Sequence, residues 1–145
     1  MSPRVEPPSP ALLLQARRNA EARLDLLNDY GAFTGATLAD ANGSTASNRA
    51  ALASRWRKEG RIFGVSYNDK TYFPSFQFDE RARPLDVIAR VMSSFRTQPI
   101  GDWEIALWFT TANESISGRR PVDLLIEDPD AVVAAAEHEI APIAG

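Results

Sequence analysis

The sequence predicts a mainly α-helical protein with one small β insertion, and three observations support this class. Apolar residues recur every three or four positions through most of the 145 residues, which is the period of an amphipathic helix. Proline precedes and glycine follows several of these segments, as is typical of helix starts and ends. Between Arg61 and Phe73 the pattern changes to aromatic and β-branched residues around a polar turn, which is typical of a β-hairpin.

These patterns divide the chain into three parts. Residues 1–9 form a proline-rich arm, residues 10–83 form a helix-turn-helix-like bundle with the hairpin, and residues 84–145 form a C-terminal helical domain. Hydrophobic residues make up 44% of the chain, so we expect a chain of this length to bury a core rather than to remain disordered.

The first helix is expected to begin at Pro10, with Ser9 as its N-cap, and to end at Gly31. Apolar residues lie along one side of this helix: Leu13, Ala16, Ala20, Leu24 and Leu27. The spacing of three and four residues predicts an amphipathic helix.

Two more helices are predicted next, one over residues 34–43 and one that starts at Thr45 or Ser47 and ends at Glu59. Two helices joined by a glycine-containing turn are typical of a helix-turn-helix. The second of them should have four apolar residues near its buried side: Ala50, Leu52, Ala53 and Trp56. The residues suited to DNA are Ser47, Asn48, Arg49, Arg55 and Lys58. An ordinary solvated helix face has the same composition, so both interpretations stay open.

The hairpin is expected to pair residues 61–67 with residues 71–73, which places it where a wing follows a recognition helix. Asn68, Asp69 and Lys70 form its predicted turn. Because Pro74 has no amide hydrogen to donate, it should end the second strand or restrict it to a sheet edge. Phe76 and Phe78 should then hold an extended segment against the helices.

The C-terminal half is predicted to be helical. A helix beginning at Pro84 presents an apolar stripe, formed by Leu85, Ile88, Met92 and Phe95. Asp102 is expected to cap the next helix, and Pro121 to begin a short one after a loop. Asp128 and Pro129 supply a cap and a first-turn proline for the last helix.

The net charge of −3 conceals an asymmetry between the two halves. Residues 1–83 carry 12 Lys and Arg against 9 Asp and Glu, a charge of +3, whereas residues 84–145 carry 4 against 10, a charge of −6. The positive excess lies between Ser44 and Lys70. It could bind nucleic acid, or it could be the solvent-exposed face of an ordinary helix.

The composition argues against most catalytic classes. The chain has no cysteine and one histidine, His138, which excludes thiolate catalysis, disulfides and a site with several histidines. No glycine-rich phosphate loop is present, so we expect neither an enzyme nor a cofactor. The first residues lack a signal peptide and no run reaches about 18 apolar residues. We therefore expect a cytoplasmic protein with no membrane partner.

The most informative segment is residues 101–136. It contains the run W-F-x-x-x-N-x-x-x-x-G-x-R-P-x-x-L-L, formed by Trp108, Phe109, Asn113, Gly118, Arg120, Pro121, Leu124 and Leu125. With the segments Glu59–Val65 and Tyr72–Asp79, this run resembles the toxin-binding domain of Xre/MbcA/ParS-type antitoxins, and ParS-like members most of all. The likeness covers roughly residues 38–139.

The resemblance implies an antitoxin that binds a RES-domain toxin and blocks its NAD site, in a hetero-oligomer that also represses its operon. Such toxins consume NAD or transfer ADP-ribose from it. The residues expected to contact the toxin are Trp108, Asn113, Arg119, Arg120, Pro121, Asp123, Glu137, His138, Glu139 and Ile143. Whether the antitoxin itself is a dimer stays open.

Several alternatives to these roles stay open. Arg120 can instead pair locally with Asp123, and Trp103 and Trp108 are more typical of a core than of a contact surface. At the level of the whole protein, the rival interpretation is a stand-alone winged-helix transcriptional regulator with a C-terminal dimerisation domain.

Overall fold

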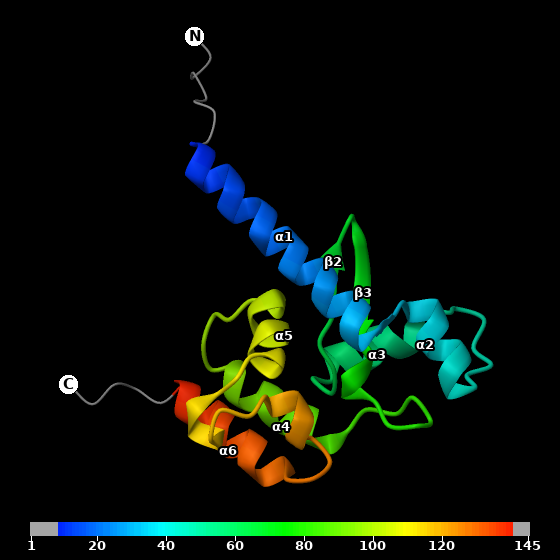
Figure 1. Cartoon of the computed structure of the whole chain (residues 1–145). Helices are drawn as coiled ribbons and strands as arrows, with labels where there is room; N and C mark the ends of the chain where they lie inside the picture. Colours follow the sequence, from blue (N-terminus) through cyan, green and yellow to red (C-terminus); the bar gives the residue numbers. More distant parts are fainter. Residues whose placement is uncertain (1–8, 141–145) are drawn as a thin grey trace.

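The computed structural model of the protein describes residues 9–140, and this part is mainly helical, as predicted. Its α-helices are α1 (Pro10–Tyr30), α2 (Gly35–Asn42), α3 (Ala51–Lys58), α4 (Asp86–Phe95), α5 (Asp102–Thr110) and α6 (Pro129–Ile140). Three short 3₁₀ turns accompany them: η1 (Ser75–Gln77), η2 (Glu114–Ile116) and η3 (Pro121–Leu124). Figure 1 shows α4, α5 and α6 grouped together, while α1 extends away from the rest.

A small antiparallel sheet joins β1 (Ala32–Phe33), β2 (Val65–Tyr67) and β3 (Lys70–Pro74) in the order β1-β3-β2. The turn between β2 and β3 uses Asn68 and Asp69 at φ values of 48° and 62°. Two successive residues of positive φ match the right-handed twist of the flanking strands, and Asn and Asp tolerate that conformation. Strand β3 ends at Pro74, as predicted.

The first strand of the hairpin is shorter than predicted. It begins at Val65 because the backbone of Phe63 pairs with a side chain instead of a strand. The amide of Phe63 donates to Oε1 of Gln77 at 2.8 Å, and Nε2 of Gln77 donates to the Phe63 carbonyl at 2.9 Å. Residues 61–64 are therefore a mostly buried connection rather than part of a ladder.

The first helix has its predicted caps, and the second lies within the predicted residues 34–43. Ser9 accepts a hydrogen bond from the amide of Leu12, and α1 ends at Gly31, whose φ is +77°. Thr34 caps α2, and Gly43 closes it in the left-handed region. Because these caps satisfy free amides and carbonyls locally, they fix both boundaries.

The start of the third helix was predicted wrongly. α3 begins at Ala51, because Oδ1 of Asn48 accepts a hydrogen bond from the Ala50 amide at 3.1 Å and holds a turn before the helix. Ala50 is consequently exposed rather than buried. Ala53 and Trp56 lie in the core, and Leu52 packs at its edge, as expected.

Two helix starts in the C-terminal half also differ from the prediction. α4 begins at Asp86, because Pro84 pairs with Phe78 in an isolated bridge and the Leu85 amide donates to the Gln77 carbonyl at 2.8 Å. Asp102 is the first residue of α5 rather than its cap. Its carboxylate accepts a hydrogen bond from Arg57 of α3 at 2.9 Å instead.

Two groups of buried residues form the core. The larger one fills the space between α4, α5 and α6 and includes Leu26, Phe63 and Val65 from the first half of the chain. The smaller one lies under α2, α3 and β3. Phe78 is buried in it and Phe76 packs against the larger core, so both phenylalanines hold the segment after β3 in place as predicted. No helix within residues 9–140 is both long and apolar enough to span a membrane.

Candidate partner-binding groove

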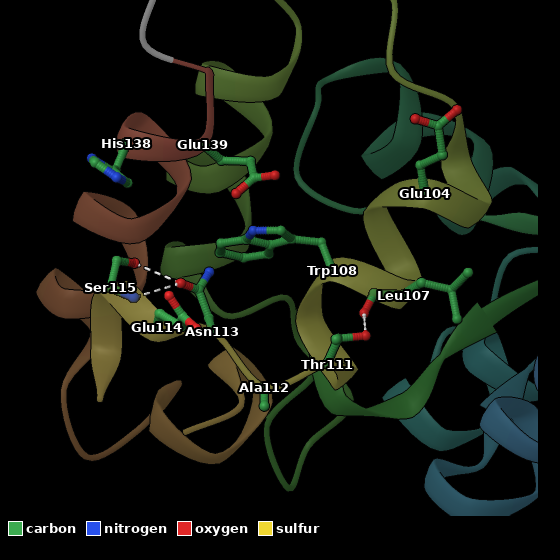
Figure 2. A pocket seen from close by; sticks show the side chains of 10 residues that line it. All are labelled: Glu104, Leu107, Trp108, Thr111, Ala112, Asn113, Glu114, Ser115, His138 and Glu139. Carbon is green, nitrogen blue, oxygen red and sulfur yellow. Dashed lines mark hydrogen bonds between the residues drawn. The ribbon is translucent and has the colours of Figure 1, made fainter. Parts of the chain in front are cut away.

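An open groove of about 740 Å³ lies between α5, η2 and the end of α6. Figure 2 shows the side chains that surround it. They are Glu104, Leu107, Trp108, Thr111, Ala112, Asn113, Glu114, Ser115, His138 and Glu139. The groove thus combines side chains from three segments that are separated in sequence.

Trp108 forms the apolar centre of the groove. Its ring packs edge-on against the rings of Phe95 and Phe109, with centroid distances of 5.0 and 5.1 Å. These two contacts fix the orientation of the indole. Figure 2 shows the indole between the side chains of Glu139 and Asn113. Its Nε1 is buried and has no hydrogen-bond acceptor within residues 9–140. A buried donor without an acceptor raises the free energy of the protein. Binding of a partner that brings an acceptor to Nε1 of Trp108 would therefore be favoured.

The turn after α5 positions the neighbouring polar residues. The hydroxyl of Thr111 donates to the Leu107 carbonyl at 2.6 Å, which satisfies a free carbonyl at the helix end. Oδ1 of Asn113 accepts hydrogen bonds from the Ser115 amide at 2.9 Å and from its hydroxyl at 2.7 Å. The backbone amide of Asn113 also donates to the backbone carbonyl of Arg119 at 3.0 Å. Asn113 therefore caps η2 and braces the loop.

The charged groups of the groove are acidic. Glu104, Glu114 and Glu139 line it together with His138, and neither Lys nor Arg is among the lining residues. None of the three carboxylates forms an ion pair in the part of the chain that the structure describes. A concave surface with clustered carboxylates and an aromatic centre suits a cationic partner.

Four of the predicted toxin-contacting residues lie together in this groove: Trp108, Asn113, His138 and Glu139. Glu137 is exposed on α6 but does not line the groove, and Pro121 is buried. Ile143 lies outside the described residues. A contact of Pro121 with a partner would therefore have to be indirect, through the shape of the loop.

The two adjacent arginines lie elsewhere and form local pairs. Arg119 pairs with Glu127 at 3.2 Å. Arg120 donates to both carboxylate oxygens of Asp123, at 3.0 and 3.3 Å, and to the Tyr30 hydroxyl at 2.8 Å. The hydrogen bond that Arg120 donates to the Asp123 carboxylate, and then the proximity of Tyr30, raise the pKa of Arg120 above its ordinary value. Arg120 thus ties the loop to the end of α1.

The residues predicted to contact DNA are only partly available. Arg55 and Lys58 are exposed on α3, although Arg55 lies 3.6 Å from Glu59. Ser47 is exposed before the helix, where Asn48 holds the turn. Arg49 is engaged with Asp40 and donates to the Ser44 carbonyl at 3.0 Å.

Sequence reasoning missed most of the residues that line the groove. Glu104, Leu107 and Thr111 share one face of α5 with Trp108, because they lie three and four positions apart. That spacing could have predicted their common face. No sequence pattern predicts the contribution of η2, because it depends on how the loop folds back toward α6. Within residues 9–140, no group of three or more His, Asp and Glu side chains lies close enough to hold a metal ion.

Comparison with known proteins adds information about the fold. No protein-family model and no curated protein matches this chain. Among solved structures, the fold is similar to the NMR structure of Rv2175c, with a TM-score of 0.65 and 18% sequence identity. The match covers 76% of this chain and 81% of that chain.

Proposed function

We propose that this chain is the antitoxin of a type II toxin–antitoxin pair. In this proposal it binds a RES-domain toxin, which consumes NAD or transfers ADP-ribose, and covers the toxin's NAD site. The observation that carries the proposal is the groove of α5, η2 and α6. It presents the partly exposed Leu107 and the half-buried Trp108 beside carboxylates that form no ion pair within residues 9–140.

The chemistry of the groove fits such a partner. NAD carries two phosphate groups, so a site that binds it needs cationic or amide donors. Glu104, Glu114 and Glu139 offer carboxylates that pair with such donors. An apolar centre with a charged rim is also the usual arrangement of a protein–protein interface, and tryptophan is enriched among the residues that dominate its binding energy.

Inhibition would then follow from occupancy alone. The chain contributes no reacting group, and it lowers toxin activity by excluding NAD from the site. Because His138 and Glu139 line the groove, the proposal places the end of α6 against the toxin. The direct role of Ile143 stays a prediction.

The test uses the chain together with the product of the neighbouring gene, which the proposal expects to be a RES protein. We expect an equimolar amount of the chain to suppress NAD consumption by that protein. The substitutions Glu139→Lys and Trp108→Ala should each weaken the complex by about 30-fold, since the loss of a central interface residue costs about 2 kcal/mol. Isothermal titration calorimetry gives the affinity, and an NAD-consumption assay gives the inhibition.

Glu80→Lys is the matched control, because it makes the same charge change at an exposed position outside the groove. It should bind the toxin like the unchanged protein. Unchanged affinity of both groove variants would refute the groove as the contact site. No association with the RES protein would refute the antitoxin function.

A second function, DNA binding, is favoured by the order of elements in residues 10–74. Two short helices, α2 and α3, precede a β-hairpin, and β1 pairs with β3 of that hairpin. This order is typical of winged-helix proteins, in which the second helix reads DNA. Arg55 and Lys58 on α3 are exposed and suited to phosphate contacts.

The DNA-binding proposal predicts a salt-dependent complex with the DNA upstream of the gene. The double substitution Arg55→Ala/Lys58→Ala should reduce the slope of log K against log salt concentration by about 2, one for each lost phosphate contact. Arg90→Ala is the control, because Arg90 lies on α4 and pairs with Asp130. Fluorescence anisotropy measures the affinity, and an identical slope for the double variant would exclude these two residues.

A further inference from the structure

The groove of α5, η2 and α6 gathers negative charge that no cation of the described chain balances. Glu104 lies on α5, Glu114 on η2 and Glu139 on α6, so each of the three elements supplies one carboxylate. The arginines at positions 119–120 follow in the next loop, but they form ion pairs outside the groove. The three carboxylates are therefore open to a cation from another molecule.

Trp108 adds an aromatic surface and an unused donor to this charge. It lines the groove, and its Nε1 is buried without an acceptor within residues 9–140. Figure 2 shows the carboxylate of Glu139 on the side of the indole where Nε1 lies. A carboxylate that moves onto Nε1 satisfies the donor, but it gives up water without gaining a countercharge. A cation that pairs with the same carboxylate offsets this cost.

We propose that the groove is a receptor for one arginine side chain of the partner. In the complex the guanidinium lies against the Trp108 ring and pairs with Glu139, whose second oxygen accepts the hydrogen bond from Nε1. This inference rests on the proposed function for the identity of the partner, and it names the chemical group that enters the groove.

The chemistry of the groove favours arginine over lysine. A planar guanidinium stacks on an indole and donates two parallel hydrogen bonds to a carboxylate, whereas an ammonium group is a compact and strongly hydrated charge. Because Glu104 and Glu114 also line the groove, the five N–H donors of an arginine have more than one acceptor within the site. Leu107, which is partly exposed beside Trp108, offers an apolar surface to the methylene stem.

The first test uses the full chain labelled with nitrogen-15 and needs no toxin. The probe is the peptide acetyl-Gly-Arg-Gly-amide, titrated at constant ionic strength while the indole N–H signals are recorded by NMR. We expect the Trp108 signal, identified by its absence from Trp108→Phe, to shift downfield and to saturate as Nε1 gains its acceptor. The Trp103 signal should stay in place, because its Nε1 already donates to the Ser66 carbonyl at 2.8 Å.

The second test compares probes and variants. The lysine peptide should bind at least about threefold more weakly than the arginine peptide, and the citrulline peptide, which has nearly the same shape without the charge, should not bind. Glu139→Gln should weaken binding of the arginine peptide by about tenfold. Glu137→Gln makes the same change at an exposed position of α6 outside the groove and should bind the peptide like the unchanged protein.

Two results would overturn the arginine receptor: equal binding of the arginine, lysine and citrulline peptides, or no shift of the Trp108 signal during the titration. Neither result bears on whether the chain inhibits a toxin. A chain that inhibits the RES protein but does not bind the arginine peptide would keep the antitoxin function and refute the receptor. Peptide binding at Trp108 without association with the RES protein would refute the antitoxin function and support the arginine site.

Discussion

Replacement of Gln77 by alanine is expected to lower the free energy of unfolding by about 3–5 kcal/mol. Gln77 is fully buried, and its amide bonds the backbone of Phe63 through both Oε1 and Nε2. Nε2 also donates to the Pro74 carbonyl at 3.2 Å. Without the side chain, one amide and two carbonyls lose their partners in a dry interior, and a cavity remains.

Chemical denaturation followed by tryptophan fluorescence measures this effect. Gln98→Ala removes the same side chain at an exposed position and should change stability by less than about 0.5 kcal/mol. Gln77→Glu has almost the same shape, but its carboxylate cannot donate to the two carbonyls. That variant should be destabilised at neutral pH and should recover as acid protonates the glutamate, because burial beside acceptors raises its pKa. A stability loss below 1 kcal/mol for Gln77→Ala would contradict the role of this network.

The Gln77 network also explains where sequence reasoning succeeded and where it failed. Caps such as Ser9, Gly31 and Asp128 were predictable, because each acts on backbone groups within a few residues. The bond between Gln77 and Phe63 joins residues 14 positions apart, and no local pattern marks it. It nonetheless decides where β2 begins, so that boundary could not be predicted from propensity.

The candidate groove shows the same limit. Trp108, Asn113, His138 and Glu139 were selected by family resemblance and by residue type, and they do lie together. Their proximity depends on how the loop after α5 folds back to α6, which sequence spacing does not encode. The three-residue spacing of Arg120 and Asp123 allows their local pairing to be predicted, whereas the bond of Arg120 to Tyr30 spans 90 positions and no local pattern marks it.

Replacement of Phe109 by alanine should destabilise the protein by about 3–5 kcal/mol, because a large aromatic side chain is removed from the core. Phe109 is fully buried and stacks on Phe63, with ring centroids 5.7 Å apart and an interplanar angle of 5°. It also contacts Phe76 at 5.3 Å and Trp108 at 5.1 Å. It therefore joins the residues before and after the hairpin to α5.

Thermal and chemical unfolding of two further variants distinguish the effect of lost buried volume from the effect of the residue's position in α5. Phe109→Leu keeps much of the buried volume and should cost less than Phe109→Ala, about 1–2 kcal/mol. Leu107 lies two residues away in the same helix and is 36% exposed. The substitution Leu107→Ala should therefore lower the free energy of unfolding by about 1 kcal/mol or less. Equal losses for Phe109→Ala and Leu107→Ala would show that the aromatic cluster does not hold α5 in place.

Phe109→Ala also has a consequence for the groove. Because Trp108 rests edge-on against Phe109, the indole should lose its fixed orientation even under conditions where the variant is still folded. Near-ultraviolet circular dichroism should then weaken in the folded variant, and affinity for the RES protein should fall without any change to a groove-lining residue. Retained affinity in a folded Phe109→Ala protein would mean that the partner does not depend on the position of Trp108.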